Sequence, residues 1–296
     1  MNRGPTRRLL LGGVAGLAAA PAPARALAPG SGRIAVPEEV GATADPVPVW
    51  FHRPAAWAPE GRVVVVMHGQ PRNARDFRDE WRDLAEAGRF LLLAPEFSEA
   101  KFPGAQHYAF ANAVDAQGRT LPRAGWSFFV LNRVVQAAMR EAGATRRTFS
   151  LYGHSSGAAF VHRYLLLTGA PLAETLVIAN GGAYTLPRAD RPFPEGLGGL
   201  DVGPEVRGAV FRRHVVVLLG EADTDPNHPT LAREPWAMAQ GSHRFARGWF
   251  FFDTMRLAAE AQGALFTWRV ATVPGVGHSS AGMARYAAEQ LFSPAP

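Results

Sequence analysis

The 296-residue sequence contains no cysteine. This absence excludes disulfide bonds, a cysteine nucleophile and thiolate metal sites, and it removes any risk of mispairing in an oxidising compartment. Internal repeats and low-complexity tracts are also missing, and 19% of the residues are charged while 47% are hydrophobic. These proportions exclude a disordered or repetitive chain and predict a globular protein with a sizeable buried core.

Acidic residues are missing from the first 26 positions. Arg3, Arg7 and Arg8 precede an apolar run at 9–20, and the small-residue stretch 22–28 follows. This charged, apolar and cleavage-site order is that of a secretory signal, and its arginine pair resembles the twin-arginine signal of bacterial export. Because the apolar run is too short to cross a bilayer, we expect a cleaved signal over 1–26. The mature protein is then periplasmic or secreted, with no stable membrane anchor.

The expected signal carries most of the basic excess. The whole chain has 31 basic and 25 acidic residues, and its net charge of +6 would suit an acidic partner such as nucleic acid. Cleavage after Ala26 is favoured over cleavage after Ala28, which would leave Pro29 first. Cleavage after Ala26 removes four arginines, which leaves 27 basic residues and 25 acidic residues in the mature chain. Nucleic acid is therefore not an expected partner, and the export machinery is expected only during transit.

Short apolar runs alternate with amphipathic segments from residue 46 onward. Strands are predicted at 46–51, 62–67, 90–94, 148–152, 176–179, 214–219 and 266–273, and helices at 73–87, 127–141, 156–167 and 279–291. The run 62–67 holds four consecutive valines, which is typical of a strand buried on both faces. Strands separated by helices predict a parallel sheet that is covered on both sides.

Two long segments, 96–125 and 181–213, interrupt the alternation of strands and helices. The first is aromatic and polar, and the second is rich in glycine, proline and arginine. Long segments inside a domain are usually functional, and neither has the low complexity of a linker. We therefore expect a single domain over 27–296 with insertions near 96–125 and 181–213, the second of them lid-like.

The segment Gly153-His154-Ser155-Ser156-Gly157 matches the pattern Gly-x-Ser-x-Gly. A serine hydroxyl is a weak nucleophile until a base takes its proton. In this pattern the glycines let a strand turn sharply into a helix, which exposes the central serine. A strand is predicted directly before the pattern and a helix directly after it. Ser155 is therefore the expected nucleophile, in preference to a glycine-rich turn without chemistry.

This strand, turn and helix resemble the α/β-hydrolase family, and the resemblance extends over residues 46–292. The valine-rich run and the His68-Gly69-Gln70 sequence after it are similar to the family's third strand and oxyanion loop. The resemblance implies an α/β fold with a mostly parallel central sheet, helices on both faces and a lid-like insertion. It also implies that the backbone N–H groups of Gln70 and Ser156 bind the developing oxyanion, each lowering the barrier by about 2.7–4 kcal/mol.

The resemblance implies that an acid follows the nucleophile and that a histidine comes last. His278 lies in a glycine-rich loop between the last predicted strand and helix, where the family has its base. The family's carboxylate lies three residues beyond the glycine that ends a strand, which selects Asp223 after Gly220. Its role is to hold the tautomer of His278 and stabilise the imidazolium. Spacing leaves Glu221 and Asp225 as alternatives, and the other histidines, among them His154 and His228, are expected to be structural.

The spacing of Asp223, Asp225 and Asn227 also resembles part of a metal-binding loop. The remaining ligands of a calcium loop are missing from the sequence. We therefore expect no metal and no cofactor.

Within the family, the chain resembles the exported branch of poly(3-hydroxybutyrate) depolymerases, feruloyl-type esterases and poly(aspartic acid) hydrolases. This narrower resemblance rests on the signal, the His68-Gly69-Gln70 loop, the Pro95-Glu96-Phe97 segment and the loop with Tyr108 and Asn112. It implies hydrolysis of a small or oligomeric carboxylic ester through an acyl-enzyme on Ser155. Amide hydrolysis, as of poly(aspartic acid), and a non-catalytic binding protein remain the alternatives.

Three aromatic residues in or beside loops are the expected contacts of a substrate. Tyr108, Trp126 and Trp236 lie in or beside loops and are predicted to line the substrate pocket. The three phenylalanines at 250–252 are predicted to pack in the core. Arg72 and Arg75, just past the oxyanion loop, are expected to be solvated or to cap a helix in preference to binding a substrate carboxylate.

Overall fold

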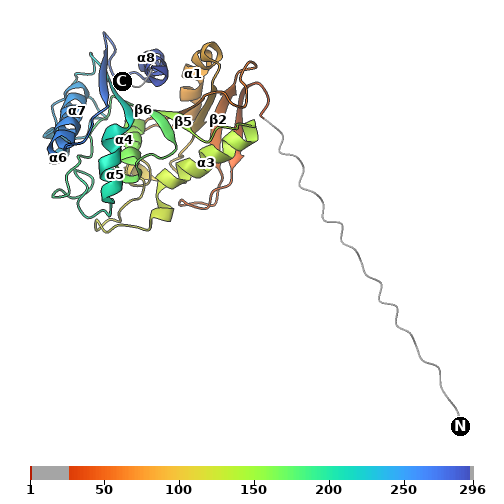
Figure 1. Ribbon diagram of the computed structural model, residues 1–296, viewed down its shortest axis with the longest axis horizontal. Coiled ribbons are helices and arrows are strands. Elements are labelled where there is room, and N and C mark those ends of the chain that lie inside the picture. The colour runs from red at the N-terminus through yellow and green to blue at the C-terminus, as the bar shows by residue number, and fades with distance from the viewer. Residues whose placement is uncertain (2–26, 294–296) are drawn as a thin grey trace.

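The computed structural model of the protein describes residue 1 and residues 27–293 (Figure 1). Apart from Met1, the expected signal at 1–26 therefore lies outside the described residues. Within the described part of the chain, no helix is both long enough and apolar enough to cross a membrane.

The described residues form one eight-stranded sheet in the order β1-β2-β4-β3-β5-β6-β7-β8. Strand β2 pairs antiparallel with both β1 and β4, and every other pair is parallel. The mostly parallel α/β sheet expected from the sequence is therefore confirmed. The strands are β1 (Gly30–Val36), β2 (Val47–Arg53), β3 (Val63–Met67), β4 (Leu91–Pro95), β5 (Phe149–His154), β6 (Ala173–Ala179), β7 (His214–Gly220) and β8 (Arg269–Val273).

Helices cover both faces of the sheet (Figure 1). Helices α1 (Ala74–Gly88) and α8 (Ser280–Phe292) pack on one face, and α3 (Ser127–Ala142), α4 (Ser156–Thr168) and α7 (Arg244–Ala261) pack on the other. The valine run of β3 shows why both faces are apolar. Successive side chains of a strand point to opposite faces, so Val63 and Val65 belong to the core under α3 and α4 while Val64 and Val66 belong to the core under α1 and α8.

One strand and one long helix were not predicted from the sequence. Strand β1 is an edge strand that follows the expected signal directly, and its alternate residues remain partly exposed. Helix α7 has apolar side chains around most of its circumference, which hides the periodicity of an amphipathic helix. Of the three phenylalanines at 250–252 that were expected in the core, Phe251 is fully buried but Phe250 is 39% exposed. The expectation was wrong for Phe250, because it lies on the outer side of α7.

The two insertions lie against each other on the sheet face that carries α3 and α4. The first contains α2 (Gly104–His107) and a 3-10 turn (Arg123–Gly125), and the second contains α5 (Pro204–Ala209) and a 3-10 turn (Val210–Arg212). Thr120 Oγ1 donates a hydrogen bond to the Gly199 carbonyl (2.6 Å), and the rings of Phe110 and Phe193 meet edge to face at 5.8 Å. The short helix α6 (Pro235–Met238) precedes α7. Residues from both insertions and from the loop before α6 line one cavity.

Candidate active site

Ser155 lies at the turn between β5 and α4. Its backbone has φ 58° and ψ −118°, a conformation that costs a non-glycine residue about 1–3 kcal/mol. The flanking glycines make the turn possible, because a Cβ at Gly153 would overlap the Gly157 carbonyl and a Cβ at Gly157 would overlap the Met67 carbonyl. The turn therefore packs directly on the end of β3 and presents the Ser155 hydroxyl at the carboxyl edge of the sheet.

A continuous chain of hydrogen bonds joins Ser155, His278 and Asp223. His278 Nε2 lies 3.0 Å from Ser155 Oγ, and His278 Nδ1 lies 2.7 Å from Asp223 Oδ2. The three residues come from three loops, those after β5, β8 and β7 respectively. The structure therefore brings together the three side chains that the sequence analysis selected.

Of the three acids considered from the sequence, Asp223 alone contacts His278. Its side chain is buried, whereas Glu221 and Asp225 are exposed. Glu221 accepts a hydrogen bond from Thr272 Oγ1 (2.7 Å), and the Asp225 carboxylate accepts one from the Asn227 N–H (2.8 Å). The geometry therefore favours Asp223 over both alternatives.

Arg244, the first residue of α7, faces the other oxygen of Asp223. Its Nη1 lies 3.6 Å from Asp223 Oδ1, and its Nη2 donates to Thr230 Oγ1 (2.8 Å). Burial lowers the pKa of Arg244, and the charge of Asp223 opposes this shift. No local pattern in the sequence indicates a role for Arg244, because the approach of α7 to the β7 loop depends on the tertiary fold.

Two histidines that were expected to be structural lie against His278. The His154 ring is 4.7 Å from the His278 ring, and the His228 ring meets it edge to face at 5.0 Å. Burial lowers the pKa of His154 well below its usual value, and desolvation with the charge of Arg244 lowers the pKa of His228. Both rings are therefore neutral near pH 7 and confine the His278 ring without adding charge beside it.

The loop after β3 is held in place by the buried side chain of His68. Its Nε2 accepts a hydrogen bond from the Phe97 N–H (3.1 Å), so Nδ1 carries the proton and donates to the Gly69 carbonyl (2.9 Å). The hydroxyl of Tyr108 donates to the His68 carbonyl (2.7 Å), and the two rings stack at 4.7 Å. These contacts fix the backbone that leads into Gln70.

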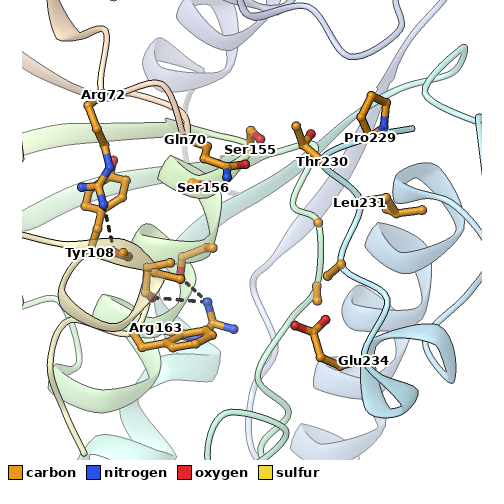
Figure 2. A pocket seen from close by; sticks show the side chains of 18 of the residues that line it. Gln70, Arg72, Tyr108, Ser155, Ser156, Arg163, Pro229, Thr230, Leu231 and Glu234 are labelled. Atoms are coloured by element: carbon orange, nitrogen blue, oxygen red, sulfur yellow. Dashed lines mark hydrogen bonds between the residues drawn. The ribbon is translucent and has the colours of Figure 1, made fainter. Parts of the chain in front are cut away.

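The backbone N–H groups of Gln70 and Ser156 are free to bind a ligand. Both residues line the cavity beside Ser155 (Figure 2). Among the described residues, neither amide donates a hydrogen bond to another protein group. Two unengaged donors next to the hydroxyl are the arrangement that stabilises a developing oxyanion.

The side chain of Arg72 is more buried than expected from the sequence. The sequence predicted a solvated or capping side chain, but its side chain is only 9% exposed. The guanidinium donates to the carbonyls of Phe97 (2.7 Å), Phe102 (3.0 Å) and Gly104 (2.9 Å) and lies 4.4 Å from the Tyr108 ring centre. It therefore ties the oxyanion loop to the first insertion. Arg75 is exposed as expected and lies 3.7 Å from Asp79.

The cavity at Ser155 has a volume of about 430 Å³. Trp236 lines it, as expected from the sequence. Tyr108 also borders the cavity, but it is almost fully buried and supports the loop at His68. The expectation was wrong for Trp126, which does not border the cavity. Its ring is fully buried in the core, and its N–H donates to the Leu121 carbonyl (2.9 Å).

The buried histidines lead to a prediction about stability in acid. Burial lowers the pKa of His68 to about 3 and that of His162 well below its usual value. A histidine whose pKa is lower in the folded state binds protons preferentially when unfolded. These histidines should therefore leave the free energy of unfolding unchanged above pH 6.5. Below pH 6.5 they should lower it, by about 1.4 kcal/mol for each histidine and each pH unit.

Urea denaturation at pH 7, 6 and 5 measures this slope. The variant His68→Gln should be less stable at pH 7, but its stability should fall less steeply in acid because one titrating group is gone. An unfolding free energy that is equal at pH 7 and pH 5 in the unaltered protein would contradict the prediction.

Comparison with solved structures identifies the fold family. The chain is 35% identical to poly(aspartic acid) hydrolase-1 from Sphingomonas sp. KT-1, with a TM-score of 0.85 over 90% of this chain and 100% of the other. It is 33% identical to LpqC, a poly(3-hydroxybutyrate) depolymerase from Bordetella parapertussis, with a TM-score of 0.84 over 91% and 92% of the two chains.

More distant structures agree on the fold. Siderophore hydrolase EstB from Aspergillus nidulans has a TM-score of 0.53 at 15% identity, over 91% of this chain and 96% of the other. No protein-family model and no curated protein matches the sequence. On the strength of the two similar structures and the shared sheet, the chain is a hydrolase and belongs to the α/β-hydrolase family.

Proposed function

We propose that this hydrolase cleaves a carboxylic ester through an acyl-enzyme on Ser155, with His278 as the base and Asp223 as the acid that orients it. The observation that carries the proposal is the unbroken hydrogen-bond chain from Asp223 through His278 to Ser155 at the edge of the cavity. A serine in a strained turn, paired with a histidine that a buried carboxylate holds, is the arrangement that activates a hydroxyl.

In the proposed reaction, Ser155 Oγ attacks the ester carbonyl as His278 Nε2 takes its proton. The carbonyl oxygen becomes negative and accepts hydrogen bonds from the amides of Gln70 and Ser156. His278 then gives the proton to the leaving alkoxide, and the acyl group stays on Ser155. A water molecule repeats the sequence with His278 as the base, which releases the acid and restores the serine.

The two similar structures bear names that point to different bonds. Poly(3-hydroxybutyrate) is a polyester, whereas poly(aspartic acid) is joined by amide bonds. We propose ester hydrolysis of a small or oligomeric substrate first, because an alkoxide leaves more readily than an amine. Amide hydrolysis is the second candidate, favoured by the likeness to the poly(aspartic acid) hydrolase. A binding protein without activity is the third, and the intact hydrogen-bond chain argues against it.

Export through a twin-arginine-like signal is part of the proposal. Its support is the order of charged, apolar and small residues in the first 28 positions. The expected consequence is that Arg7→Lys with Arg8→Lys keeps the precursor unprocessed inside the bacterium. Immunoblots of cytoplasmic and periplasmic fractions would show the precursor and the shorter mature chain as separate bands.

The experiment that tests the proposed function is labelling of the mature protein with a fluorophosphonate probe. Such probes react with a serine that a base activates beside an oxyanion site, so we expect one adduct, on Ser155. Mass spectrometry of the digested protein locates it. Ester, oligoester and amide substrates would then be compared. A folded protein without an adduct, or with an adduct elsewhere, would contradict the proposal.

A further inference from the structure

Arg163 is a buried cation in the wall of the cavity. It lies on α4, eight residues beyond Ser155, and is 1% exposed. Nε donates to Thr185 Oγ1 (2.8 Å), and Nη1 donates to the carbonyls of Ala159 (3.1 Å) and Ala109 (3.3 Å). These three bonds hold the guanidinium rigidly, and its central carbon lies over the Phe110 ring, 4.7 Å from the ring centre.

The second terminal nitrogen of Arg163 has no partner. Among the described residues nothing accepts a hydrogen bond from Nη2, yet protein atoms do not enclose it, because the residue borders the cavity. In Figure 2 the other terminal nitrogen is joined by dashed lines to two oxygens, and the free one lies on the side toward Glu234. A donor is thus presented to whatever occupies the cavity.

No carboxylate of the described chain neutralises Arg163. Two of the other three buried arginines near the site have a carboxylate close to the guanidinium. Arg244 faces Asp223, and Arg72 pairs with Glu99 at 3.1 Å. Arg247 lacks a carboxylate too, but each of its three guanidinium nitrogens has an acceptor within the fold and it does not border the cavity. Of these four arginines, Arg163 alone combines an uncompensated charge with a donor that faces the cavity.

Burial alone lowers the pKa of Arg163, to about 9, so the side chain remains charged at neutral pH. A desolvated charge without an anion is costly to keep. An anionic ligand in the cavity would supply the missing partner, with a charge-assisted hydrogen bond to Nη2.

The distance to Ser155 sets the size of such a ligand. The Ala159 N–H donates to the Ser155 carbonyl, and Arg163 in turn donates to the Ala159 carbonyl. The Ala159 carbonyl that the guanidinium contacts therefore lies about one helical turn, or roughly 6 Å along the axis, from the Ser155 carbonyl. A carboxylate on Nη2 and a carbonyl carbon at Ser155 Oγ are then a few bonds apart.

We infer that Arg163 binds a carboxylate carried by the substrate, so that the preferred substrates are esters or amides of short dicarboxylic acids or acid-terminated oligomers. This inference rests on the proposed function, because it assigns the carboxylate a place relative to a carbonyl at Ser155. Glu234, exposed on the opposite wall, forms no ion pair with Arg163 and would repel the same anion. The charged groups that face the carboxylate are therefore Arg163, Glu234 and the paired Arg72 and Glu99.

The test measures how a dianion protects Ser155 from a fluorophosphonate probe. Glutarate should slow labelling of the unaltered protein, and neutral glutaramide at the same concentration and ionic strength should not. In Arg163→Met the concentration of glutarate needed for half protection should rise by about tenfold to a hundredfold, the loss expected for a charged hydrogen bond. In Glu234→Gln it should fall, because a repulsive charge is removed. Arg163→Lys, which keeps the charge, should lie between the unaltered protein and Arg163→Met.

The outcomes separate this inference from the proposed function. No labelling of the unaltered protein would contradict the proposed function itself. Labelling that glutarate and glutaramide slow equally would overturn the role of Arg163 while leaving Ser155 as the nucleophile. If Arg163→Met fails to fold, as circular dichroism would show, the glutarate and glutaramide comparison and the opposite shift in Glu234→Gln still decide the question.

Discussion

Ser155→Ala is expected to abolish hydrolysis of a short-chain aryl ester, with a fall in kcat of roughly a million-fold. The substitution removes the hydroxyl that His278 Nε2 contacts at 3.0 Å, and no other hydroxyl contacts that nitrogen among the described residues. Steady-state rates with 4-nitrophenyl butyrate, together with circular dichroism to show that the fold is intact, measure the effect.

Two further variants sharpen this result. Ser156→Ala removes the neighbouring hydroxyl but keeps the backbone N–H that borders the cavity, so this variant should remain active. His278→Ala should lose about as much as Ser155→Ala, and the double variant should lose no more, because the two residues act as one unit. Substantial activity in Ser155→Ala would refute the acyl-enzyme.

Asp223→Asn should lower kcat by about ten-thousand-fold. An asparagine can present an N–H to His278 Nδ1, which favours the tautomer with its proton on Nε2, and that tautomer cannot accept the proton of Ser155. The variant also leaves Arg244, 3.6 Å away, without its carboxylate. Breaking a buried pair in this way is costly, so we expect stability to fall by about 3 kcal/mol.

The matched control for Asp223→Asn is Asp225→Asn. Asp225 lies two residues further along the same loop, but it is exposed and its carboxylate caps the Asn227 N–H. Its substitution should leave ester hydrolysis nearly unaltered. Rates and urea denaturation curves for both variants would be compared at pH 8. A larger loss in Asp225→Asn would assign the acid to that residue and contradict the observed geometry.

The parts of the fold that the sequence predicted are those encoded by short, local patterns. A four-valine run can be recognised as a buried strand. The Gly-x-Ser-x-Gly turn can be recognised because a Cβ on either glycine would overlap a backbone carbonyl. The expected order of serine, acid and histidine placed Ser155, Asp223 and His278 on separate loops, and the structure brings them within hydrogen-bond distance.

Roles that depend on contacts between distant positions in the chain could not be predicted from the sequence. Arg163 reaches the carbonyl of Ala109, 54 positions earlier in the chain, and no local pattern signals that approach. Tyr108 and Trp126 illustrate a second difficulty. Tyr108 lies in the first insertion and Trp126 directly follows it, and both are almost fully buried, yet of the two only Tyr108 borders the cavity. An aromatic residue that lines a pocket and one that packs in the core have the same hydrophobicity and the same kind of position near a loop. The sequence alone therefore does not distinguish the two.

The bonds of Arg72 and Tyr108 join the first insertion to the loop after β3. The three carbonyls that Arg72 binds and the ring it covers belong to the first insertion, while Arg72 itself comes two residues after Gln70. Tyr108, from that same insertion, holds the His68 carbonyl. The insertion that lines the cavity therefore also supports the loop whose amides are proposed to bind the oxyanion. If the first insertion were exchanged between relatives, we expect the rate to be kept only when Arg72 and Tyr108 are exchanged together with it.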